Sequence, residues 1–249
     1  MAKKRVSLTV EEELVERIDS EASGEDLNRS QMVEEIVESY FSRQSIDTAV
    51  VLCGDPELRS LDERDGRPVI EHILEHLQQQ GFRRALLLVG RNTELREELG
   101  AAFDGLKLEY ISEEQPRGTA AALRKAEGLI EGAFAVLNGH VITDVDFDEM
   151  AEVHREEDSV ATMALTTVED PSRYGVARLK GSRILGFEEK PEEGEEPSRL
   201  INAGSYLFDQ EIFERLEEDS LEEVFEKLAS RGELSGYIYG GEWIDVAEV

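Results

Sequence analysis

Cysteine is nearly absent from this chain of 249 residues, which contains Cys53 and no other cysteine. A single cysteine cannot form a disulfide within the chain and leaves no cysteine cluster for a structural zinc ion. Long apolar runs are absent as well, because no stretch reaches the roughly 18 apolar residues that a membrane-spanning helix needs. The N-terminus leads into an alternating segment instead of the apolar region of a signal peptide. These absences predict a soluble, cytoplasmic protein with no membrane partner.

Positive charge is also scarce. The chain has 27 Lys+Arg, of which 7 are lysine, against 57 Asp+Glu, and its formal net charge is −30. The acidic residues are spread along the whole chain and do not form a tail. Such a surface repels itself at low salt and is tolerated where ions screen it over short distances. The composition therefore indicates a halophilic protein adapted to a salt-rich cytosol, with binding of cations or basic partners as the alternative.

The first 45 residues differ in pattern from the rest and are predicted to form a domain of their own. Residues 4–10 alternate polar and apolar side chains, which is typical of a half-buried strand. A helix is predicted from Glu11 to Ala22, with Thr9 as its N-cap, and a second helix from Asn28. A unit of this size cannot bury enough apolar surface alone, so the pattern predicts a homodimer or a higher oligomer.

This strand-helix-helix order, with Asn28-Arg29-Ser30 opening the second helix, resembles the ribbon-helix-helix DNA-binding family. The resemblance implies that strands from two chains pair into an antiparallel ribbon that enters the DNA major groove. The alternation would place three apolar side chains in the dimer core, namely Val6, Leu8 and Val10. The side chains that would reach the base edges are Arg5, Ser7 and Thr9. Backbone N–H groups at Arg29 and Ser30 would hold a DNA phosphate.

The charge of this N-terminal domain is unusual for a DNA-binding protein, since residues 1–45 contain 6 basic and 11 acidic side chains. Lys3, Lys4 and Arg5 are nevertheless grouped at the ribbon. In concentrated salt, counterion release contributes little to affinity, so contacts to bases must contribute more. The alternative is an arm that only dimerises the protein.

Residues 46–249 form the second predicted domain. Its strands are predicted at 49–52, 85–89, 106–111 and 133–137, and its helices at 68–80, 93–102, 118–131 and 147–157. Further strands are predicted at 159–168, 175–179, 184–188 and 201–208. Alternation of strands and helices predicts an α/β fold with a Rossmann-like, mixed and mainly parallel sheet.

Six phrases in this domain, in order and spacing, resemble the sugar-phosphate nucleotidyltransferases, also called nucleoside-diphosphate-sugar pyrophosphorylases. They lie at 113–123, 137–146, 168–175, 187–191, 200–204 and 243–245. The resemblance implies a pocket for a sugar phosphate, a nucleotide or a nucleotide sugar. Gly118 and Thr119 would open a helix near the nucleotide, with no side chain on Gly118 to keep the base away.

The sugar half of the pocket would be lined by Tyr174, Gly175, Glu189, Lys190, Asn202 and Gly204. Glu189 can accept hydrogen bonds from sugar hydroxyls, Lys190 can pair with a phosphate, and Asn202 can both donate and accept. Taken singly, Gly118, Lys190 and Asn202 also fit ordinary turn or surface positions.

The phosphate-binding loop departs from the family pattern. Relatives have a glycine-rich loop and a Pro-Lys-Pro motif, whereas this chain has residues 53–59, Cys-Gly-Asp-Pro-Glu-Leu-Arg, and no lysine motif. Only Gly54 and Arg59 remain from the loop. Asp55 and Glu57 would repel a triphosphate. Cys53 is interpreted as a small buried residue and not as a nucleophile.

The metal site departs as well. The family holds Mg²⁺ with two aspartates; Asp245 keeps one of these positions, and His140 replaces the other. His140 is interpreted as a position that has lost its role, with a catalytic base, or a transition-metal ligand beside Asp144 and Asp245, as alternatives.

We therefore predict a dimeric DNA-binding transcriptional regulator whose nucleotidyltransferase-like domain is a degenerate sensor for a sugar phosphate, nucleotide or nucleotide sugar. The alternative is an active enzyme that joins a nucleoside triphosphate to a sugar 1-phosphate with Mg²⁺, using Arg59, Asp245 and Lys190. Loss of a phosphate-binding lysine and a metal ligand favours weak or absent turnover.

Overall fold

The computed structural model describes residues 6–24, 27–44, 46–54, 59–91, 94–113 and 115–247. The chain divides into two units, Met1–Ser45 and Ile46–Val249, and each is described by itself. Within the described residues, no helix combines the length and the apolar character needed to span a bilayer.

The N-terminal unit consists of two packed helices, α1 (Glu12–Gly24) and α2 (Arg29–Gln44). A reciprocal capping box begins α2. Oδ1 of Asn28 accepts hydrogen bonds from the N–H groups of Ser30 and Gln31 at 3.0 and 3.1 Å. Oε1 of Gln31 accepts from the Asn28 N–H at 3.0 Å. These bonds satisfy N–H groups that lack partners inside the helix, so the helix begins where the sequence predicted.

The predicted strand over residues 4–10 is not formed within the single chain. Residues 6–10 have no regular secondary structure, and residues 4 and 5 lie outside the described part. A strand needs a neighbour to pair with, and the predicted neighbour belongs to a second chain. The position of Thr9 was also wrong, because α1 begins at Glu12 and Thr9 lies too far upstream to be its N-cap.

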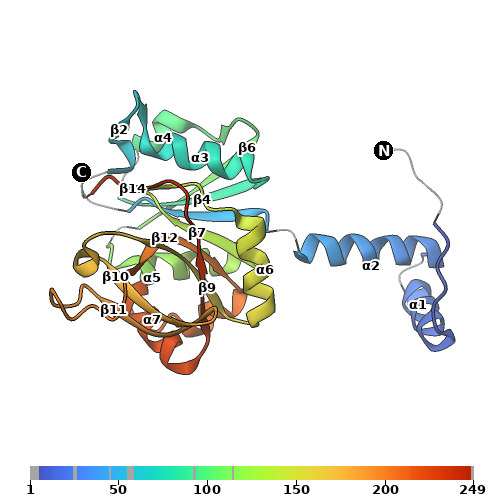
Figure 1. Ribbon diagram of the computed structural model, residues 1–249. Coiled ribbons are helices and arrows are strands. Elements are labelled where there is room, and N and C mark those ends of the chain that lie inside the picture. Colours follow the sequence, from blue (N-terminus) through green and yellow to red (C-terminus); the bar gives the residue numbers. More distant parts are fainter. Residues whose placement is uncertain are drawn as a thin grey trace. The chain divides into compact units, whose positions relative to one another are not determined.

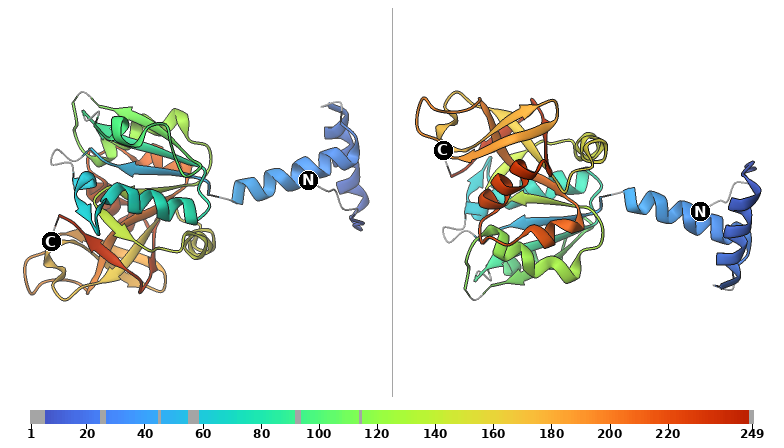
Figure 2. Two further views of the ribbon diagram at one scale, coloured as in Figure 1. Left: turned by 90° about the horizontal axis from the view of Figure 1, so that it is seen from above. Right: turned by 90° about the horizontal axis from the view of Figure 1, so that it is seen from below.

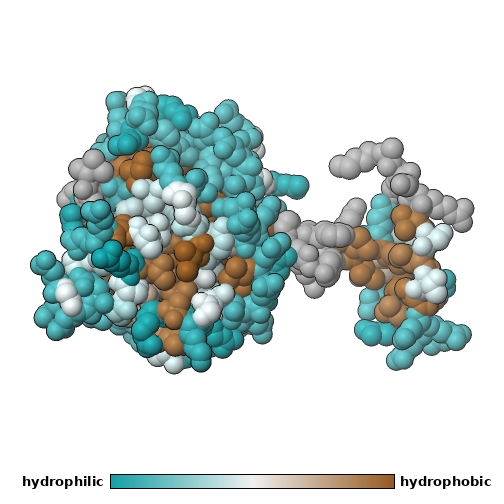
Figure 3. All heavy atoms as spheres, viewed as in Figure 1, coloured by the Kyte–Doolittle hydropathy of each residue, from teal (hydrophilic) through white to brown (hydrophobic). Residues whose placement is uncertain are grey.

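Apolar side chains of the N-terminal unit are widely exposed, as Figure 3 shows. Val6 and Leu8 are 71% and 70% exposed, although alternation predicted them to be in a core. The other exposed large apolar side chains of this unit are Val10, Leu14, Ile36 and Val37. An exposed apolar surface of this kind is typical of protein–protein contacts.

A ten-stranded mixed sheet forms the centre of the second unit (Figure 1). Its strand order is β10-β11-β13-β9-β12-β7-β1-β4-β6-β5. The central strands are parallel to one another: β7 (Phe134–Asn138), β1 (Thr48–Leu52), β4 (Arg84–Gly90) and β6 (Leu106–Ser112). The remaining strands are β5 (Ala102–Phe103), β9 (Ala161–Thr167), β10 (Gly175–Lys180), β11 (Arg183–Glu189), β12 (Leu200–Phe208) and β13 (Leu234–Ile238). Two small pairs lie apart from this sheet: β2 (Glu63–Arg64) with β3 (Arg67–Pro68), and β8 (Val141–Thr143) with β14 (Trp243–Asp245).

Helices cover both faces of the large sheet (Figures 1 and 2). One face packs against α3 (Val69–Gln79), α4 (Glu94–Leu99) and α6 (Phe147–Glu157). The other face packs against α5 (Thr119–Leu123), α7 (Leu221–Arg231) and the 3₁₀ segments η2 (Arg124–Leu129) and η4 (Gln210–Arg215). Two further 3₁₀ turns are η1 (Arg59–Leu61) and η3 (Pro171–Arg173). Each face thus has its own apolar cluster, which gives the α/β fold that the sequence predicted.

The predicted helix over 118–131 is in fact two elements, because α5 passes into η2 after Leu123. The sequence interpretation did not assign α7, although its signals are present. Ser220 caps the helix by accepting from the Glu223 N–H, and Gly232 ends it in the left-handed conformation. The intervening buried residues repeat at helical spacing: Leu221, Val224, Phe225 and Leu228.

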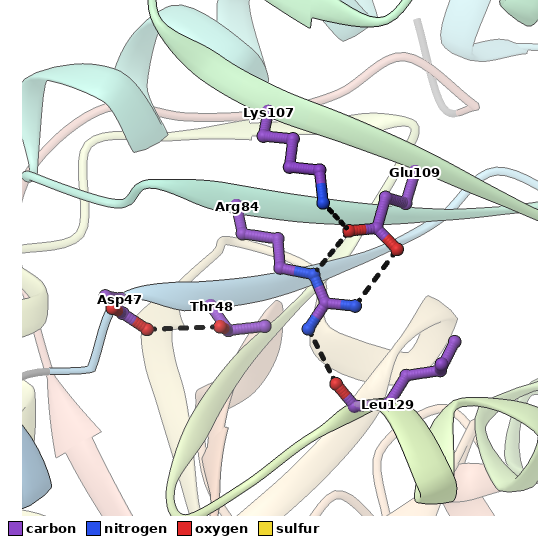
Figure 4. A network of polar contacts seen from close by, with 6 residues as sticks. All are labelled: Asp47, Thr48, Arg84, Lys107, Glu109 and Leu129. Carbon is purple, nitrogen blue, oxygen red and sulfur yellow. Dashed lines mark hydrogen bonds and ion pairs between the residues drawn. The ribbon is translucent and has the colours of Figure 1, made fainter.

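An ionic cluster ties β4 to β6 at the amino end of these strands (Figure 4). Nε of Arg84 donates to the Glu109 carboxylate at 2.8 Å, and Lys107 pairs with the same carboxylate at 2.8 Å. Arg84 also donates to the carbonyl oxygen of Leu129 at 2.6 Å. Hydrogen bonds from Arg84, and then from Lys107, lower the pKa of Glu109 to about 2.

Candidate functional site

A pocket of about 620 Å³ lies at the carboxyl ends of the parallel strands β1, β4, β6 and β7. From β1 the chain continues to β4 and β6 on one side of β1, and it then returns to β7 on the other side. In open α/β sheets, ligands bind outside the carboxyl ends of the strands at such a reversal of strand order. The topology alone therefore marks this pocket as the candidate site.

The pocket brings together the ligand-binding and catalytic positions that the sequence predicted for this unit, and the two positions predicted for the Mg²⁺ site. These residues are Gly54, Arg59, Gly118, Thr119, His140, Tyr174, Gly175, Glu189, Lys190, Asn202, Gly204 and Asp245. The loop carboxylates Asp55 and Glu57 lie outside the described residues. The roles of the pocket residues remain predictions.

Gly175 and Glu189 pair across the β10–β11 ladder at the sugar side of the pocket. A Cβ atom on Gly175 would stand 2.2 Å from Cζ of Phe187 and 2.8 Å from Oε2 of Glu189, so only glycine fits here. Burial raises the pKa of Glu189, and the nearby Glu222 carboxylate raises it further. The pocket therefore holds a half-buried carboxylate whose charge a hydrogen-bonding ligand can stabilise.

Lys190 follows β11 in a left-handed backbone conformation, with φ of 48°. Among the described residues, the other non-glycine positions with positive φ are aspartates, which adopt this conformation more readily than lysine does. The Lys190 N–H donates to the carbonyl oxygen of Tyr174 at 3.1 Å, which fixes the turn. Unusual backbone of this kind is concentrated at functional sites, and Lys190 lines the pocket.

Asn202 lies where β12 shifts its register against β9. As assigned, its Oδ1 accepts from the Gly204 N–H at 3.0 Å, and its Nδ2 donates to the Tyr206 hydroxyl at 2.8 Å. The Asn202 side chain thus stabilises the irregular stretch of β12 that borders the pocket. The turn role and the ligand-binding role considered from the sequence are both compatible with this geometry.

Gly118 is needed for a reason that the sequence did not reveal. A Cβ atom at Gly118 would stand 2.2 Å from the carbonyl oxygen of Asp219. That oxygen accepts from the N–H groups of Ala120 and Ala121 at 3.0 and 3.2 Å. Two N–H groups at the start of α5, which the resemblance assigned to the nucleotide, are therefore bonded to the protein itself. The Thr119 hydroxyl likewise accepts from the Leu221 N–H at 2.9 Å.

His140 and Asp245 stand on paired segments that border the pocket. Asp245 is paired with Val141, and the Val246 N–H donates to the His140 carbonyl oxygen at 3.1 Å. Oδ1 of Asp245 accepts from the Ala247 N–H at 2.9 Å. This donor set, one imidazole and one partly occupied carboxylate, does not fit a two-carboxylate Mg²⁺ site.

The transition-metal alternative was wrong in its third ligand. Asp144 lies past the far end of β8, where its N–H donates to the Glu242 carbonyl oxygen at 3.3 Å, and it does not line the pocket. Across the described part of the chain, no three His, Cys, Asp or Glu side chains are grouped closely enough to hold a metal ion.

Comparison with known families agrees with this geometry. Residues 56–249 match the family described as nucleotidyl transferase. The chain belongs to the nucleotidyl transferase family. Residues 4–44 match a second family, described as ribbon-helix-helix protein, copG family. Both resemblances seen in the sequence are thereby confirmed.

Curated relatives of this chain include a mannose-1-phosphate guanylyltransferase subunit and a bifunctional protein. The chain is 35% identical to the mannose-1-phosphate guanylyltransferase catalytic subunit beta of Drosophila pseudoobscura pseudoobscura, over 76% of this chain and 53% of that protein. It is 34% identical to the bifunctional protein GlmU of Methanococcus maripaludis, over 73% of this chain and 44% of that protein. The chain thus spans about half the length of the curated relatives it matches.

Solved structures share the fold of this chain. A UDP-glucose pyrophosphorylase complexed with UDP-glucose superposes with a TM-score of 0.70 at 20% identity, covering 81% of this chain and 93% of that one. At this identity the likeness concerns the fold alone.

Two carboxylates that line the pocket, Glu113 and Glu222, were not assigned from the sequence. Glu113 directly follows β6, and the residue is only 7% exposed. Lys125 approaches its Oε1 at 3.7 Å. Glu222 enters the pocket from the first turn of α7. Glu113 could have been found from the sequence, because it directly follows a buried parallel strand. Glu222 could not, because the helix that carries it, α7, was not assigned.

Cys53 is buried behind Gly139, as predicted. The cysteine is 1% exposed, and burial raises the pKa of its thiol to about 12. A Cβ atom on Gly139 would lie 2.7 Å from the Leu52 carbonyl oxygen and 3.0 Å from the Cys53 sulfur. A protonated, enclosed thiol is no nucleophile at neutral pH.

The DNA-binding positions of the N-terminal unit are only partly visible. Ser7 and Thr9 are exposed, and Arg5 lies outside the described residues. The Arg29 guanidinium forms an ion pair with Asp19 of α1, with Nε donating to Oδ1 at 2.6 Å. This bond lowers the pKa of Asp19 and joins the two helices. The Ser30 N–H, one of the two backbone groups predicted to hold a phosphate, donates to Oδ1 of Asn28 at 3.0 Å and so has a partner inside the chain.

Proposed function

We propose that this chain is a dimeric DNA-binding regulator whose nucleotidyl transferase domain recognises a guanine nucleotide sugar, or the sugar phosphate part of one, without efficient turnover. The composition of the pocket carries the proposal. The side chains suited to a sugar phosphate line it together, whereas the end expected to hold the metal combines His140 with Asp245. Binding needs the first set, and nucleotidyl transfer needs charge neutralisation that the second set does not supply.

The sugar side supplies complementary hydrogen-bonding groups. Glu189 accepts from hydroxyls, and the Lys190 ammonium offers a point charge for a phosphate at the edge of the same pocket. The Tyr174 ring lies against Trp243, with ring centroids 5.3 Å apart, and gives this side an apolar wall. Such a mixture of an apolar surface and a few polar groups suits a sugar ring.

Glu113 supports guanine as the base. Guanine presents two neighbouring N–H donors, at N1 and at the 2-amino group, and a carboxylate can accept from both at once. Uracil and adenine lack this pair of donors. The Glu113 carboxylate is nearly buried at the nucleotide side of the pocket and has Lys125 beside it. Two matched acceptors in a desolvated site discriminate strongly between bases.

The N-terminal unit supports the DNA-binding part of the proposal. Its exposed apolar residues, Val6, Leu8 and Val10, alternate with the polar Ser7 and Thr9. Pairing with a second copy would bury the first set and present the second on one face of a ribbon. Ligand binding would then regulate DNA binding through its differential affinity for two arrangements of the dimer.

Isothermal titration calorimetry in molar KCl tests ligand recognition. We expect GDP-mannose to bind more tightly than UDP-glucose, and mannose 1-phosphate to bind more weakly than either. An absence of heat with all three compounds would contradict the proposed sensor.

Electrophoretic mobility shift with DNA from upstream of the gene tests the regulator. We expect a shift that GDP-mannose alters and that Arg5→Ala removes. A protein that dimerises but shifts no DNA would instead support the role of a dimerisation arm.

An active nucleotidyl transferase is the second candidate. It is favoured because Arg59 and Asp245 both line the pocket and because relatives at 35% and 34% identity are named as guanylyltransferase subunits. Pyrophosphate release from GTP and mannose 1-phosphate, with and without Mg²⁺, decides between the candidates. Turnover that Asp245→Asn abolishes would contradict our proposal of a non-catalytic site.

A further inference from the structure

One side chain, Arg124, holds the segment of residues 216–221 against the start of η2. Its Nη1 donates to the carbonyl oxygens of Leu216 and Glu218 at 2.5 and 2.6 Å. Its Nη2 donates to the Asp219 carboxylate at 2.8 Å. A guanidinium is suited to this task because its planar fork offers several donors in fixed directions. Arg124 thus bonds to three positions of one short segment.

The backbone of this segment is bonded to α5 as well. The Asp219 carbonyl oxygen accepts from Ala120 and Ala121, and the Leu221 N–H donates to the Thr119 hydroxyl. Gly118 and Thr119 line the pocket directly. The 216–221 segment is therefore a second layer beneath the nucleotide side of the pocket, joined to it by backbone hydrogen bonds.

The same segment determines where α7 begins. Ser220 is the N-cap of α7, with its hydroxyl accepting from the Glu223 N–H at 3.2 Å, and Glu222 lies in the first turn. Glu222 lines the pocket. Because a helix extends rigidly from its first turn, a shift of the segment would move the Glu222 carboxylate within the pocket.

Glu222 acts on Glu189 at the sugar side. Burial raises the pKa of Glu189 most, Glu222 raises it next, Lys190 lowers it and Glu226 raises it. Glu189 also acts on the buried Tyr206 hydroxyl, as does Glu222. Both carboxylates line the pocket, and α7 packs against β11, so the two side chains offer acceptors to the hydroxyls of one bound sugar.

We propose that Glu222 is a further ligand-binding carboxylate and that Arg124 is its positioning residue, acting by holding the 216–221 segment against α5. The inference rests on the proposed function, because the ligand is the sugar of a nucleotide sugar. Arg124 then affects ligand binding only by fixing the position of Glu222.

A double-mutant cycle measured by calorimetry with GDP-mannose tests this assignment. We expect Arg124→Gln and Glu222→Gln each to weaken binding about tenfold, as for loss of one hydrogen bond to a charged group. If Arg124 acts through Glu222, the double variant will lose no more than the larger single loss. The matched control is Arg183→Gln, which removes an exposed arginine that pairs with Glu157 away from the pocket. Additive losses would overturn the proposal.

A readout without ligand separates this inference from the proposed function. In the full chain labelled with ¹³C at glutamate side chains, we expect Arg124→Gln to lower the pKa of Glu189 towards its ordinary value, since Glu222 would move away. Amide exchange at Ala120, Ala121 and Leu221 should become faster in the same variant. Faster exchange with an unchanged Glu189 titration would show a merely structural role and overturn the positioning role. If the wild type binds no sugar compound, the proposed function fails, while this titration still decides whether Arg124 positions Glu222.

Discussion

The two units of this protein bury their apolar side chains in different ways. In the second unit, apolar clusters on both sheet faces are complete within one chain, and residues such as Val50 and Leu86 are fully buried. In the N-terminal unit, Val6 and Leu8 remain 71% and 70% exposed although they follow the pattern of a core. The lesson is that alternation reports a buried face without saying which molecule buries it. The second unit is self-contained, whereas the N-terminal unit leaves apolar side chains exposed, which we propose a second copy covers.

A substitution at Gly175 tests the packing of the second unit most directly. We expect Gly175→Ala to destabilise this unit by about 3 kcal/mol, because its methyl group would overlap the Phe187 ring. Urea unfolding in molar KCl measures the change. Gly128→Ala is the control, since a Cβ atom there meets nothing within 4 Å. Equal stabilities for the two variants would show that the sheet edge adapts freely.

The dependence of the N-terminal unit on a partner is tested by Leu8→Asp. A charge buried in the dimer core is poorly tolerated, so we expect DNA affinity to fall about 100-fold or more, with a shift from dimer to monomer. Mobility shift and analytical ultracentrifugation measure these effects, and Ser7→Ala is the control for oligomeric state. Because the second unit packs within one chain, we expect Leu8→Asp to leave the affinity for GDP-mannose unchanged. A Leu8→Asp protein that remains dimeric would place the dimer contact elsewhere.

Within the ligand-binding unit, Glu113→Gln should change the choice of base. A glutamine offers one acceptor and one donor where guanine needs two acceptors, so we expect GDP-mannose affinity to fall about tenfold. UDP-glucose affinity should change little, and calorimetry measures both. Glu127→Gln, at an exposed position of η2, is the control. An equal loss for both nucleotides would contradict base recognition by Glu113.

The smallest effect concerns the ionic cluster of Figure 4. The pKa of Glu109 is lowered to about 2, so its ionised form stabilises the fold above the pKa of the unfolded chain. This contribution is lost as pH falls from about 4.5 through about 2. Because the cluster is partly exposed, we expect Glu109→Gln to cost at most about 1 kcal/mol at pH 7. Urea unfolding at pH 7 and pH 3 should show the difference shrink at the lower pH, whereas the exposed Glu98→Gln should show none. A difference that grows at low pH would contradict the assigned pKa.

Buried apolar runs predicted the parallel centre of the fold well. Segments such as 85–89 and 133–137 have no polar face, and the sheet places both between covering helices. The strand predicted over 4–10 is not formed by the described residues 6–10 of the single chain, and its predicted partner strand belongs to a second copy. The capping box at Asn28 was predictable from sequence because all its partners lie within three residues.

The pocket residues were predicted from the family phrases. The contacts that hold those residues in place were not predicted. Gly118 was assigned to the nucleotide, yet its missing side chain makes room for Asp219. Arg124 and Asp219 are 95 positions apart in the sequence, so their contact could not be seen in any local pattern. Local periodicity in the sequence identifies helices and strands. The hydrogen bonds that position the pocket residues join segments far apart in the sequence.

Burial of Cys53 gives the protein an internal reporter of opening. The sulfur lies between the end of β1 and Gly139, beside the ligand pocket, in a place that reagents reach only when this corner separates. The rate of alkylation by iodoacetamide should therefore report how often the structure around Cys53 opens locally. A bound nucleotide sugar should slow that rate, which makes the lone sulfur a gauge of occupancy that needs no added label.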